Sequence, residues 1–436
     1  MDPITTGILG SALLVLLLFL GMPIAFVMML VGFCGIWSLT SIGAALPKVS
    51  ETVYGVAANY PYTIIPLFIL MGSFAGSGGI TRQLYDTFDK WFRKFPGGLG
   101  IATIAACAGF AAVSGSSVAA AAAMGNVALP EMRRFGYAPK LACGVVAAGG
   151  TLSFLIPPSL GFVVFGMLTE QSIGKLLIAG ILPGIVLSLA YIVVVISLVK
   201  MDPSLAPRTP GEVTFKEKLI ALKGVWETLL VFFIVMGGIY LGFINPTEAG
   251  AIGATSLFII VLMKRKLTWK TLFTSLLEMA RISVMVLFLV AGATLFSYFL
   301  ALSTIPTTVS TWIGGLGVSK YVILTIIIAI YFFLGCFLDS VSMMVLTLPV
   351  IFPIIVAIGF NPIWFGVVAV LMMEAGLITP PVGLNIYTIA GIAKDVPMGE
   401  IFRGAMPFLL AIIATAIILT IFPIIALYLP SLMGGG

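Results

Sequence analysis

The chain contains no histidine, and only 9% of its 436 residues are charged. Without histidine, the Ser-His-Asp and Cys-His arrangements that activate a serine or cysteine nucleophile are excluded. The small charged fraction stands beside 61% hydrophobic residues, a composition far outside that of soluble domains. We therefore expect a membrane protein, and not an enzyme of these two classes.

Cysteine and phosphate-binding motifs are equally scarce. The four cysteines are isolated in apolar segments and form no CxxC pair, so neither a zinc site nor a disulfide framework is expected. Gly174-Lys175 is the sole Gly-Lys pair, and Leu176 follows it without the spacing of a P-loop. Any pumping must therefore draw its energy from an ion gradient or from another subunit.

Apolar runs of membrane-spanning length recur from end to end. The longest polar interval, about 200–223, is too short for a soluble domain, so we predict one polytopic unit in a lipid bilayer. Polar or basic stretches at 41–60 and 81–97 are expected to be loops. The net charge of +6 is spread over short loops, which gives no reason to expect a nucleic-acid partner. Met1-Asp2-Pro3 lacks the features of a signal peptide, which predicts a retained first span.

Two segments, about 98–132 and about 321–358, have the pattern of re-entrant helical hairpins. In the first, the small hydroxyl-rich stretch 113–118 (VSGSSV) interrupts an apolar run. Irregular backbone at membrane depth is tolerated only where it lines a cavity or is buried in protein. Both flanks of this segment are basic, which places both in the cytoplasm; an ordinary single span could not do that.

Counting basic residues predicts the topology. If the first hairpin opens inward and the second outward, external loops hold only Lys48, Lys175 and Lys320, leaving 19 of the 22 Lys and Arg inside. Reading either hairpin as one ordinary span removes this asymmetry. The amino terminus should therefore be periplasmic.

An internal repeat organises the chain. Pro157-Pro158 aligns with Pro380-Pro381 at an offset of 223, which also places Ser116-Ser117 on Asp339-Ser340. Both double prolines break an apolar span. We predict an all-α polytopic membrane protein with two inverted-topology repeats, each holding a hairpin and a broken helix. The expected divisions are scaffold helices at 1–60, the first repeat at 61–200, a central loop with scaffold helices at 201–280, and the second repeat at 281–436.

Inverted repeats with broken helices place ion and substrate sites near the midplane, where the breaks converge. Hydroxyl, carbonyl and carboxylate oxygens suit Na⁺ better than a soft metal, and half-helix N-termini attract carboxylates. The predicted Na⁺ ligands are Ser114, Ser116, Ser117, Thr151, Pro157, Asp339, Ser340, Ser342 and Thr379. The predicted substrate contacts are Ser117, Pro158, Ser159, Ser340, Pro381 and Asn385. We expect no catalytic residue and no organic cofactor.

Structural roles compete with these assignments. The tip serines could simply cap two helix ends, and Ser73 or Ser153 could serve helix packing. Asp339 and Glu374 lie in apolar stretches, where an ionisable group is costly and by default a functional candidate. For Glu374 a structural pairing within the helix bundle is an equal alternative.

These residues resemble those of a known family, the large membrane subunit of tripartite ATP-independent periplasmic (TRAP) transporters. The resemblance covers almost the whole chain and rests on 113–119 (VSGSSVA), 155–159 (LIPPS), 335–349 (GCFLDSVSMMVLTLP) and 377–383 (LITPPVG). It implies an elevator-type, sodium-coupled secondary importer in a bacterial or archaeal inner membrane. Substrates in such a family are mostly carboxylates, such as C4-dicarboxylates and sugar acids including sialic acid.

The resemblance also implies two partners, a small membrane subunit on a separate polypeptide and a periplasmic substrate-binding protein. One alternative is a stand-alone carboxylate symporter driven by Na⁺ or H⁺, in which Asp339 could carry protons. A remoter alternative is an intramembrane enzyme, which no paired-aspartate or HExxH motif supports.

Overall fold

The computed structural model describes residues 2–207, 213–315 and 317–433, and over these ranges every regular element is helical. The chain begins with α1 (Pro3–Phe19), α2 (Ile24–Leu39), α3 (Ile42–Ala57), the 3₁₀ turn η1 (Tyr60–Thr63) and α4 (Ile64–Ser77). The interval 41–60, expected to be a loop, therefore contains a helix. Thr52 and Val56 are buried on α3 while most of its other side chains are exposed, which explains its mixed composition.

The next segment holds the first predicted hairpin and broken span. Its helices are α5 (Ile80–Phe92), α6 (Gly98–Ser114), α7 (Ser117–Arg134), α8 (Pro139–Leu155), α9 (Leu160–Thr169), α10 (Ile173–Ala179) and α11 (Ile181–Met201). The prediction of a loop at 81–97 was wrong over α5. Its charged residues occupy one face of an amphipathic helix, while Ile80, Leu84 and Tyr85 are buried on the other.

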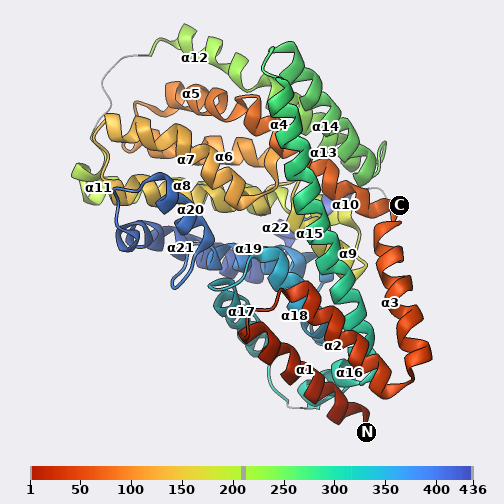
Figure 1. Cartoon of the computed structure of the whole chain (residues 1–436). Helices are drawn as coiled ribbons and strands as arrows, with labels where there is room; N and C mark the ends of the chain where they lie inside the picture. Colours follow the sequence, from red (N-terminus) through yellow and green to blue (C-terminus); the bar gives the residue numbers. More distant parts are fainter. Residues whose placement is uncertain (1, 208–212, 316, 434–436) are drawn as a thin grey trace.

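The central region is helical on both sides of the undescribed residues 208–212. It contains η2 (Pro203–Leu205), α12 (Phe215–Ala221), η3 (Leu222–Gly224), α13 (Trp226–Tyr240), α14 (Pro246–Met263) and α15 (Trp269–Leu302). The 34-residue helix α15 is continuous across the predicted boundary at 280/281, so that boundary does not separate two elements. Figure 1 shows α15 running from the α4–α14 group toward α16, with α2 beside it.

The last part repeats the order of the first hairpin region. It comprises α16 (Ile305–Gly315), α17 (Lys320–Gly335), α18 (Ser340–Ala357), α19 (Pro362–Gly376), α20 (Leu384–Ile392), α21 (Met398–Ile421) and α22 (Ile424–Leu432). Helices α7 and α18 start at residues 117 and 340, and helices α8 and α19 at 139 and 362, each 223 positions apart. Both α8 and α19 begin with proline, whose fixed φ suits the first helical position.

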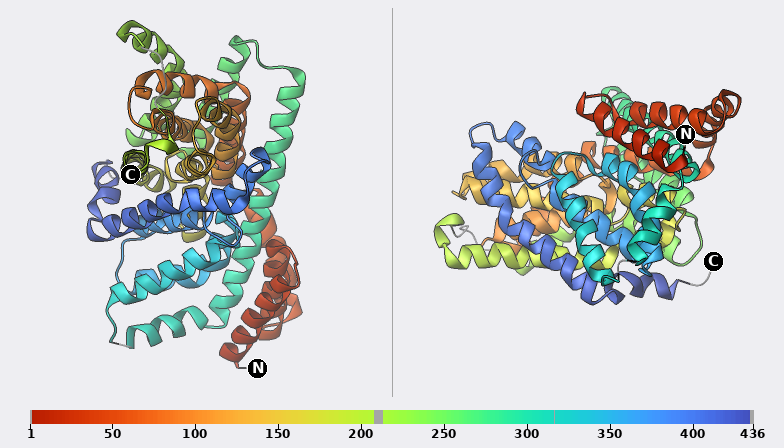
Figure 2. Two further views of the ribbon diagram at one scale, coloured as in Figure 1. Left: turned by 90° about the vertical axis from the view of Figure 1, so that its left-hand side faces the viewer. Right: turned by 90° about the horizontal axis from the view of Figure 1, so that it is seen from below.

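The correspondence extends to the helices outside the hairpins. Helices α1 and α13 start at residues 3 and 226, and α2 and α14 at 24 and 246. Packing is reciprocal, because α2 lies along α15 while α14 lies along α4. The views in Figure 2 place α1, α2 and α3 beside one part of α15 and the α12 region at the opposite end of the molecule.

The chain is an all-helical polytopic membrane protein. Among the described residues, five helices are long and apolar enough to cross a bilayer, or up to eight if each of three bent pairs forms one span. Helices α8 and α9 make one such pair, with an angle of 41° between them. Large apolar side chains are exposed along α1, α2, α13 and α15, as expected for surfaces that meet lipid or another membrane protein.

Candidate functional site

The tip of the first hairpin is a short break between α6 and α7. Gly115 ends α6 with φ 68°, a left-handed conformation that glycine adopts without a steric penalty. Ser116 is the N-cap of α7, and its hydroxyl accepts a hydrogen bond from the Ala119 N–H (3.4 Å). A buried serine lies on each side of the break, with Ser114 7% and Ser117 3% exposed.

The tip of the second hairpin uses a carboxylate where the first uses a hydroxyl. Asp339 Oδ1 accepts hydrogen bonds from the N–H groups of Val341 and Ser342, both 3.1 Å long, and so caps α18. A negative charge at this helix end also interacts favourably with the helix dipole. Ser340 and Ser342 follow on α18 and are 5% and 6% exposed. The expected capping role of the tip residues is therefore present in the structure.

The first hairpin tip packs directly on the first broken span. The Leu160 N–H donates to the Gly115 carbonyl (3.5 Å), and a Cβ placed on Gly115 would lie 2.9 Å from the Pro158 oxygen. Ser159 caps α9 by accepting from the Phe162 N–H and donates its own proton to the Phe154 carbonyl. The Pro157–Pro158 and Pro380–Pro381 peptide bonds are both cis.

The second broken span joins the two halves of the molecule. The Asn385 N–H donates to the Leu377 carbonyl, and the Asn385 side-chain amide donates to the Ala147 carbonyl of α8, each over 3.1 Å. The Asn385 Oδ1 is buried and has no hydrogen-bond partner among the described residues. The Thr379 hydroxyl donates to the Ala375 carbonyl (2.7 Å), which leaves its oxygen lone pairs available.

The predicted residues fall into two groups. The two hairpin tips meet at a cavity of about 360 Å³ whose lining includes Ser116, Ser117, Asp339, Ser340 and Glu374. The remaining predicted residues lie outside that lining: Ser114, Thr151, Pro157, Pro158, Ser159, Ser342, Thr379, Pro381 and Asn385. Thr151 is fully buried, where its hydroxyl donates to the Ala148 carbonyl and lies 2.8 Å from the Tyr191 hydroxyl.

A carboxylate on α19 connects the tips. Glu374 is fully buried, and its two oxygens accept from different hydroxyls: Oε2 from Ser117 and Oε1 from Ser340, the latter over 3.1 Å. Sequence reasoning raised a structural pairing for Glu374 but did not identify these partners. The available signal was a glutamate in an otherwise apolar helix.

A larger cavity of about 550 Å³ adjoins the tips and shares Ser116, Leu160 and Ile282 with the smaller one. It is bounded by α4, α7 and the first turns of α15. Ser73 Oγ lies 2.6 Å from Glu278 Oε2 and 3.0 Å from Ser275 Oγ in its wall. Sequence reasoning missed the Ser275 and Glu278 contribution because it started the span near residue 281, beyond the turns of α15 that carry them.

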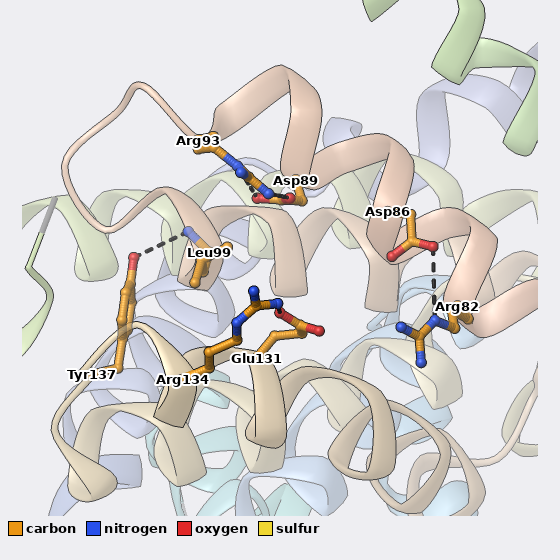
Figure 3. Close-up of polar contacts among 8 residues, drawn as sticks. All are labelled: Arg82, Asp86, Asp89, Arg93, Leu99, Glu131, Arg134 and Tyr137. Carbon is orange, nitrogen blue, oxygen red and sulfur yellow. Dashed lines mark hydrogen bonds and ion pairs between the residues drawn. The ribbon is translucent and has the colours of Figure 1, made fainter. Parts of the chain in front are cut away.

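Polar contacts lie within α5 and within the open end of the first hairpin, which pack beside each other (Figure 3). Asp89 accepts from the Arg93 guanidinium on α5, and Arg134 lies 3.8 Å from Glu131 on α7. The Tyr137 hydroxyl accepts from the Leu99 N–H at the start of α6 (3.1 Å). The hydrogen bond between the Arg93 guanidinium and Asp89 is the main cause of the raised pKa of Arg93, so this guanidinium stays charged.

Comparisons with known proteins agree with this architecture. The family described as "Tripartite ATP-independent periplasmic transporter, DctM component" matches residues 11–425. A C4-dicarboxylate TRAP transporter large permease protein of Pseudomonas aeruginosa is 38% identical over 92% of this chain and 92% of that protein. A sialic acid TRAP transporter large permease protein of Vibrio cholerae is 29% identical over 96% of this chain and 97% of that protein.

Solved structures show the same kind of fold at low sequence identity. The YdaH transporter of Alcanivorax borkumensis aligns with a TM-score of 0.65 and 15% identity, over 89% of this chain and 88% of that one. Neisseria gonorrhoeae MtrF aligns with a TM-score of 0.53 and 14% identity, over 86% and 84% of the respective chains. The extent of the family match and the identity to the Pseudomonas permease together show that the chain belongs to the DctM component family of TRAP transporters, and is a transport protein and not an enzyme.

Proposed function

We propose that the chain is the translocation subunit of a Na⁺-coupled, binding-protein-dependent importer of an organic acid. The observation that carries the proposal is the convergence of the two hairpin tips, with their serines and Asp339, on one cavity. Broken helices that meet at membrane depth are the usual place for ion and substrate sites in secondary transporters.

The residues of the tips fit a sodium ion. Their donors are hydroxyl, carboxylate and peptide oxygens, which are hard ligands suited to Na⁺. In the proposed sites, Ser114, Ser116, Ser117, Thr151 and the Pro157 carbonyl serve the first repeat. Asp339, Ser340, Ser342 and Thr379 serve the second. A bound sodium ion supplies positive charge that offsets the charge of the substrate.

An organic acid is the substrate class that the site supports. The N-termini of α7 and α18 border the tip cavity, where helix dipoles and free N–H groups favour a carboxylate. Lys270 and Glu278 both line the adjoining larger cavity, so its wall holds one basic and one acidic side chain. Relatives carry names for C4-dicarboxylate, sialic acid and 2,3-diketo-L-gulonate, all acids. Ser159, Pro158, Pro381 and Asn385 are the proposed further contacts.

The proposed movement is of the elevator type, in which the hairpins and broken spans shift against α1–α4 and α13–α15. The constant helix offsets and the reciprocal packing of α2 with α15 and α14 with α4 support two inverted repeats. The expected setting is a bacterial or archaeal inner membrane, with the amino terminus in the periplasm. The proposed scaffold and repeat regions are 1–60, 61–200, 201–280 and 281–436. The boundary at 280/281 falls within α15 and so does not separate two elements.

Two partners complete the proposed system: a small membrane subunit and a periplasmic substrate-binding protein. An isethionate TRAP transporter permease protein named DctMQ, from Oleidesulfovibrio alaskensis, is 33% identical to this chain. The match covers 95% of this chain but only 64% of DctMQ. The additional length of that protein is consistent with a second membrane component fused to a unit like this chain.

For the membrane potential to favour uptake of a monoanion, more than one sodium ion must accompany it. Inward movement of a monoanion against a negative interior costs about 2.3 kcal/mol per 100 mV. Two sodium ions make the transported charge net positive, so the membrane potential then favours uptake. Two repeat-related tips meet this minimum.

The test is uptake of radiolabelled C4-dicarboxylate and sialic acid into proteoliposomes that contain the chain, its small subunit and its binding protein. We expect uptake of one acid to need both an inward Na⁺ gradient and the binding protein, and to fall sharply in Ser117→Ala and Asp339→Ala. Uptake by the chain alone would instead indicate a stand-alone symporter. Uptake that follows a pH gradient and ignores Na⁺ would contradict the sodium sites.

A further inference from the structure

The Glu374 carboxylate is the shared acceptor of two repeat-related serines. Ser117 is the first residue of α7 and Ser340 the first residue of α18, 223 positions apart. Each donates its hydroxyl proton to a different oxygen of Glu374. All three side chains are buried, with exposed fractions of 0% for Glu374, 3% for Ser117 and 5% for Ser340. The two hairpin tips are therefore connected through one side chain.

This connection breaks the symmetry of the repeats. The counterpart of Glu374 in the first repeat, at the same offset of 223, is Thr151. The Thr151 hydroxyl contacts Tyr191 and the Ala148 carbonyl, and among the described residues it makes no hydrogen bond to either tip. Among the described residues, only the second broken span supplies a side-chain acceptor for the tip serines, and that acceptor is an ionisable group in a place where charge is costly.

The arrangement has a chemical consequence for the serine oxygens. A serine hydroxyl has a single proton and two lone pairs. Because the proton of each tip serine points at Glu374, the lone pairs of each oxygen point away from it and remain free to bind a cation. A carboxylate that fixes a ligand's orientation in this way strengthens cation binding without touching the cation. Asp339 has a different partner set, since its Oδ1 caps the α18 backbone.

We propose that Glu374 is the positioning residue that couples the two hairpin tips, so that occupation of one sodium site prepares the other. The inference rests on the proposed sodium-coupled function. A cation at Ser117 fixes that hydroxyl and with it Glu374, which orders Ser340 before the second cation arrives. Because the first cation has already fixed Glu374 and Ser340, the second cation binds with a smaller loss of conformational entropy. This gives positive cooperativity between the sites.

The experiment measures uptake by the assembled transporter as a function of external Na⁺ concentration, for the wild type and Glu374→Gln. The amide accepts with its oxygen alone, so one tip serine loses its acceptor. We expect the Na⁺ concentration for half-maximal uptake to rise about tenfold, the effect of losing one charge-assisted hydrogen bond. We also expect the Hill coefficient for Na⁺ to fall from about 2 to about 1 as the sites uncouple.

Three further variants separate positioning from a merely structural role. Glu374→Asp shortens the side chain but keeps the charge, and should recover part of the Na⁺ affinity. In Glu374→Gln/Ser117→Ala, the half-maximal concentration should rise by less than the product of the two single effects, since both remove one interaction. Glu400→Gln, on the exposed start of α21, is the matched control and should leave the Na⁺ curve unchanged.

The outcomes distinguish this inference from the function on which it rests. A wild-type transporter without Na⁺ dependence would refute the proposed function itself. A Na⁺-dependent wild type with an unaltered Hill coefficient and half-maximal concentration in Glu374→Gln would overturn the role of Glu374. If Glu374→Gln does not assemble, Ser340→Ala and Ser117→Ala replace it. Equal loss of cooperativity in both supports the coupling, and cooperativity retained in either contradicts it.

Discussion

The two hairpins have the same construction but different surroundings. On α7, Ala119 and Asn126 are exposed and face the larger cavity. On α18, the residue that corresponds to Ala119 is Ser342, which is 6% exposed, and Val345 one turn later is fully buried. Helix α18 packs against α9, α15, α16, α17 and α19, whereas α7 packs against α5, α6, α8 and α20, so contact with α15 is what distinguishes α18. One face of the first hairpin is therefore open where the same face of the second is closed.

This difference assigns a state to the structure within the proposed mechanism. In the proposed orientation, which follows the positive-inside count, the mouth of the first hairpin faces the cytoplasm. A cavity that runs from the tips along α7 would then lead inward, while packing around α18 closes the outward route. In the proposed mechanism one route is closed while the other is open, and the contact of α18 with α15 is the packing that closes the outward route.

The largest effect is expected where the second hairpin meets its broken span. A Cβ at Gly376 would lie 2.3 Å from the carbonyl carbon of Gly335, and neither backbone can move aside. Gly376→Ala should destabilise the protein by about 1–3 kcal/mol, measured as a lower thermal unfolding temperature of the purified complex. Gly391→Ala on α20 is the control, since nothing lies within 4 Å of its Cβ position. Equal unfolding temperatures for both variants would contradict the tight packing of α17 on α19.

A smaller effect is expected at the first hairpin. A Cβ at Gly72 would lie 2.7 Å from the Ser114 oxygen, but the adjoining cavity gives the tip room to shift. Gly72→Ala should cost about 1 kcal/mol of stability and should slow uptake, because in the proposed mechanism the hairpin moves against α4. Gly76→Ala, one turn along the same helix, has no atom within 4 Å and should behave like the wild type. If the two variants transport at equal rates, the tip does not pass close to α4.

Cysteine accessibility tests the open and closed faces directly. A cysteine at Ala122, which lines the larger cavity, should react readily with a water-soluble maleimide supplied from the cytoplasmic side. A cysteine at Val345, fully buried in the second hairpin, should react slowly from either side. The wild type provides the background from its own four cysteines. Faster labelling at Val345 than at Ala122 would reverse the comparison.

The smallest effect concerns a surface ion pair between α7 and the second repeat. Asp395 accepts from the Arg133 guanidinium (2.6 Å), and its own backbone N–H together with this guanidinium lowers the pKa of Asp395. Because the pKa of Asp395 is lower in the folded state than its ordinary value of about 3.9, this group stabilises the folded protein at pH values above that ordinary value. That stabilisation is lost as the pH falls through the folded-state pKa. Asp395→Asn should therefore lower the unfolding temperature slightly at pH 7 and not at all at strongly acidic pH. A difference that grows on acidification would contradict this sign.

Sequence reasoning located the breaks because their causes are local. Glycine at 115 before a capping serine, and a capping aspartate at 339 before two serines, end and restart a helix wherever they stand. The double prolines fixed the broken spans for the same reason. Helix α5 was mistaken for a loop because Arg82 and Lys90 were read as loop charge, although Ile80 and Leu84 carry a helical period.

The contacts that assemble the site were beyond such reasoning. Ser117 and Glu374 are 257 residues apart, and only the packing of α7, α18 and α19 brings them together. The same holds for Ser73 and Glu278, 205 residues apart. Sequence pattern indicates which residues are available for a site, while the meeting of two repeats decides which of them become neighbours.

The most direct test of two sodium sites is the stoichiometry of transport. The reversal potential of substrate flux can be measured in proteoliposomes that hold the complete system, with the Na⁺ gradient fixed and the membrane potential varied. We predict that at least two sodium ions, one for each hairpin tip, accompany each monocarboxylate, so that uptake carries net positive charge inward. A flux that ignores the membrane potential, or a ratio of one sodium ion or none, would contradict the assignment of one site to each tip.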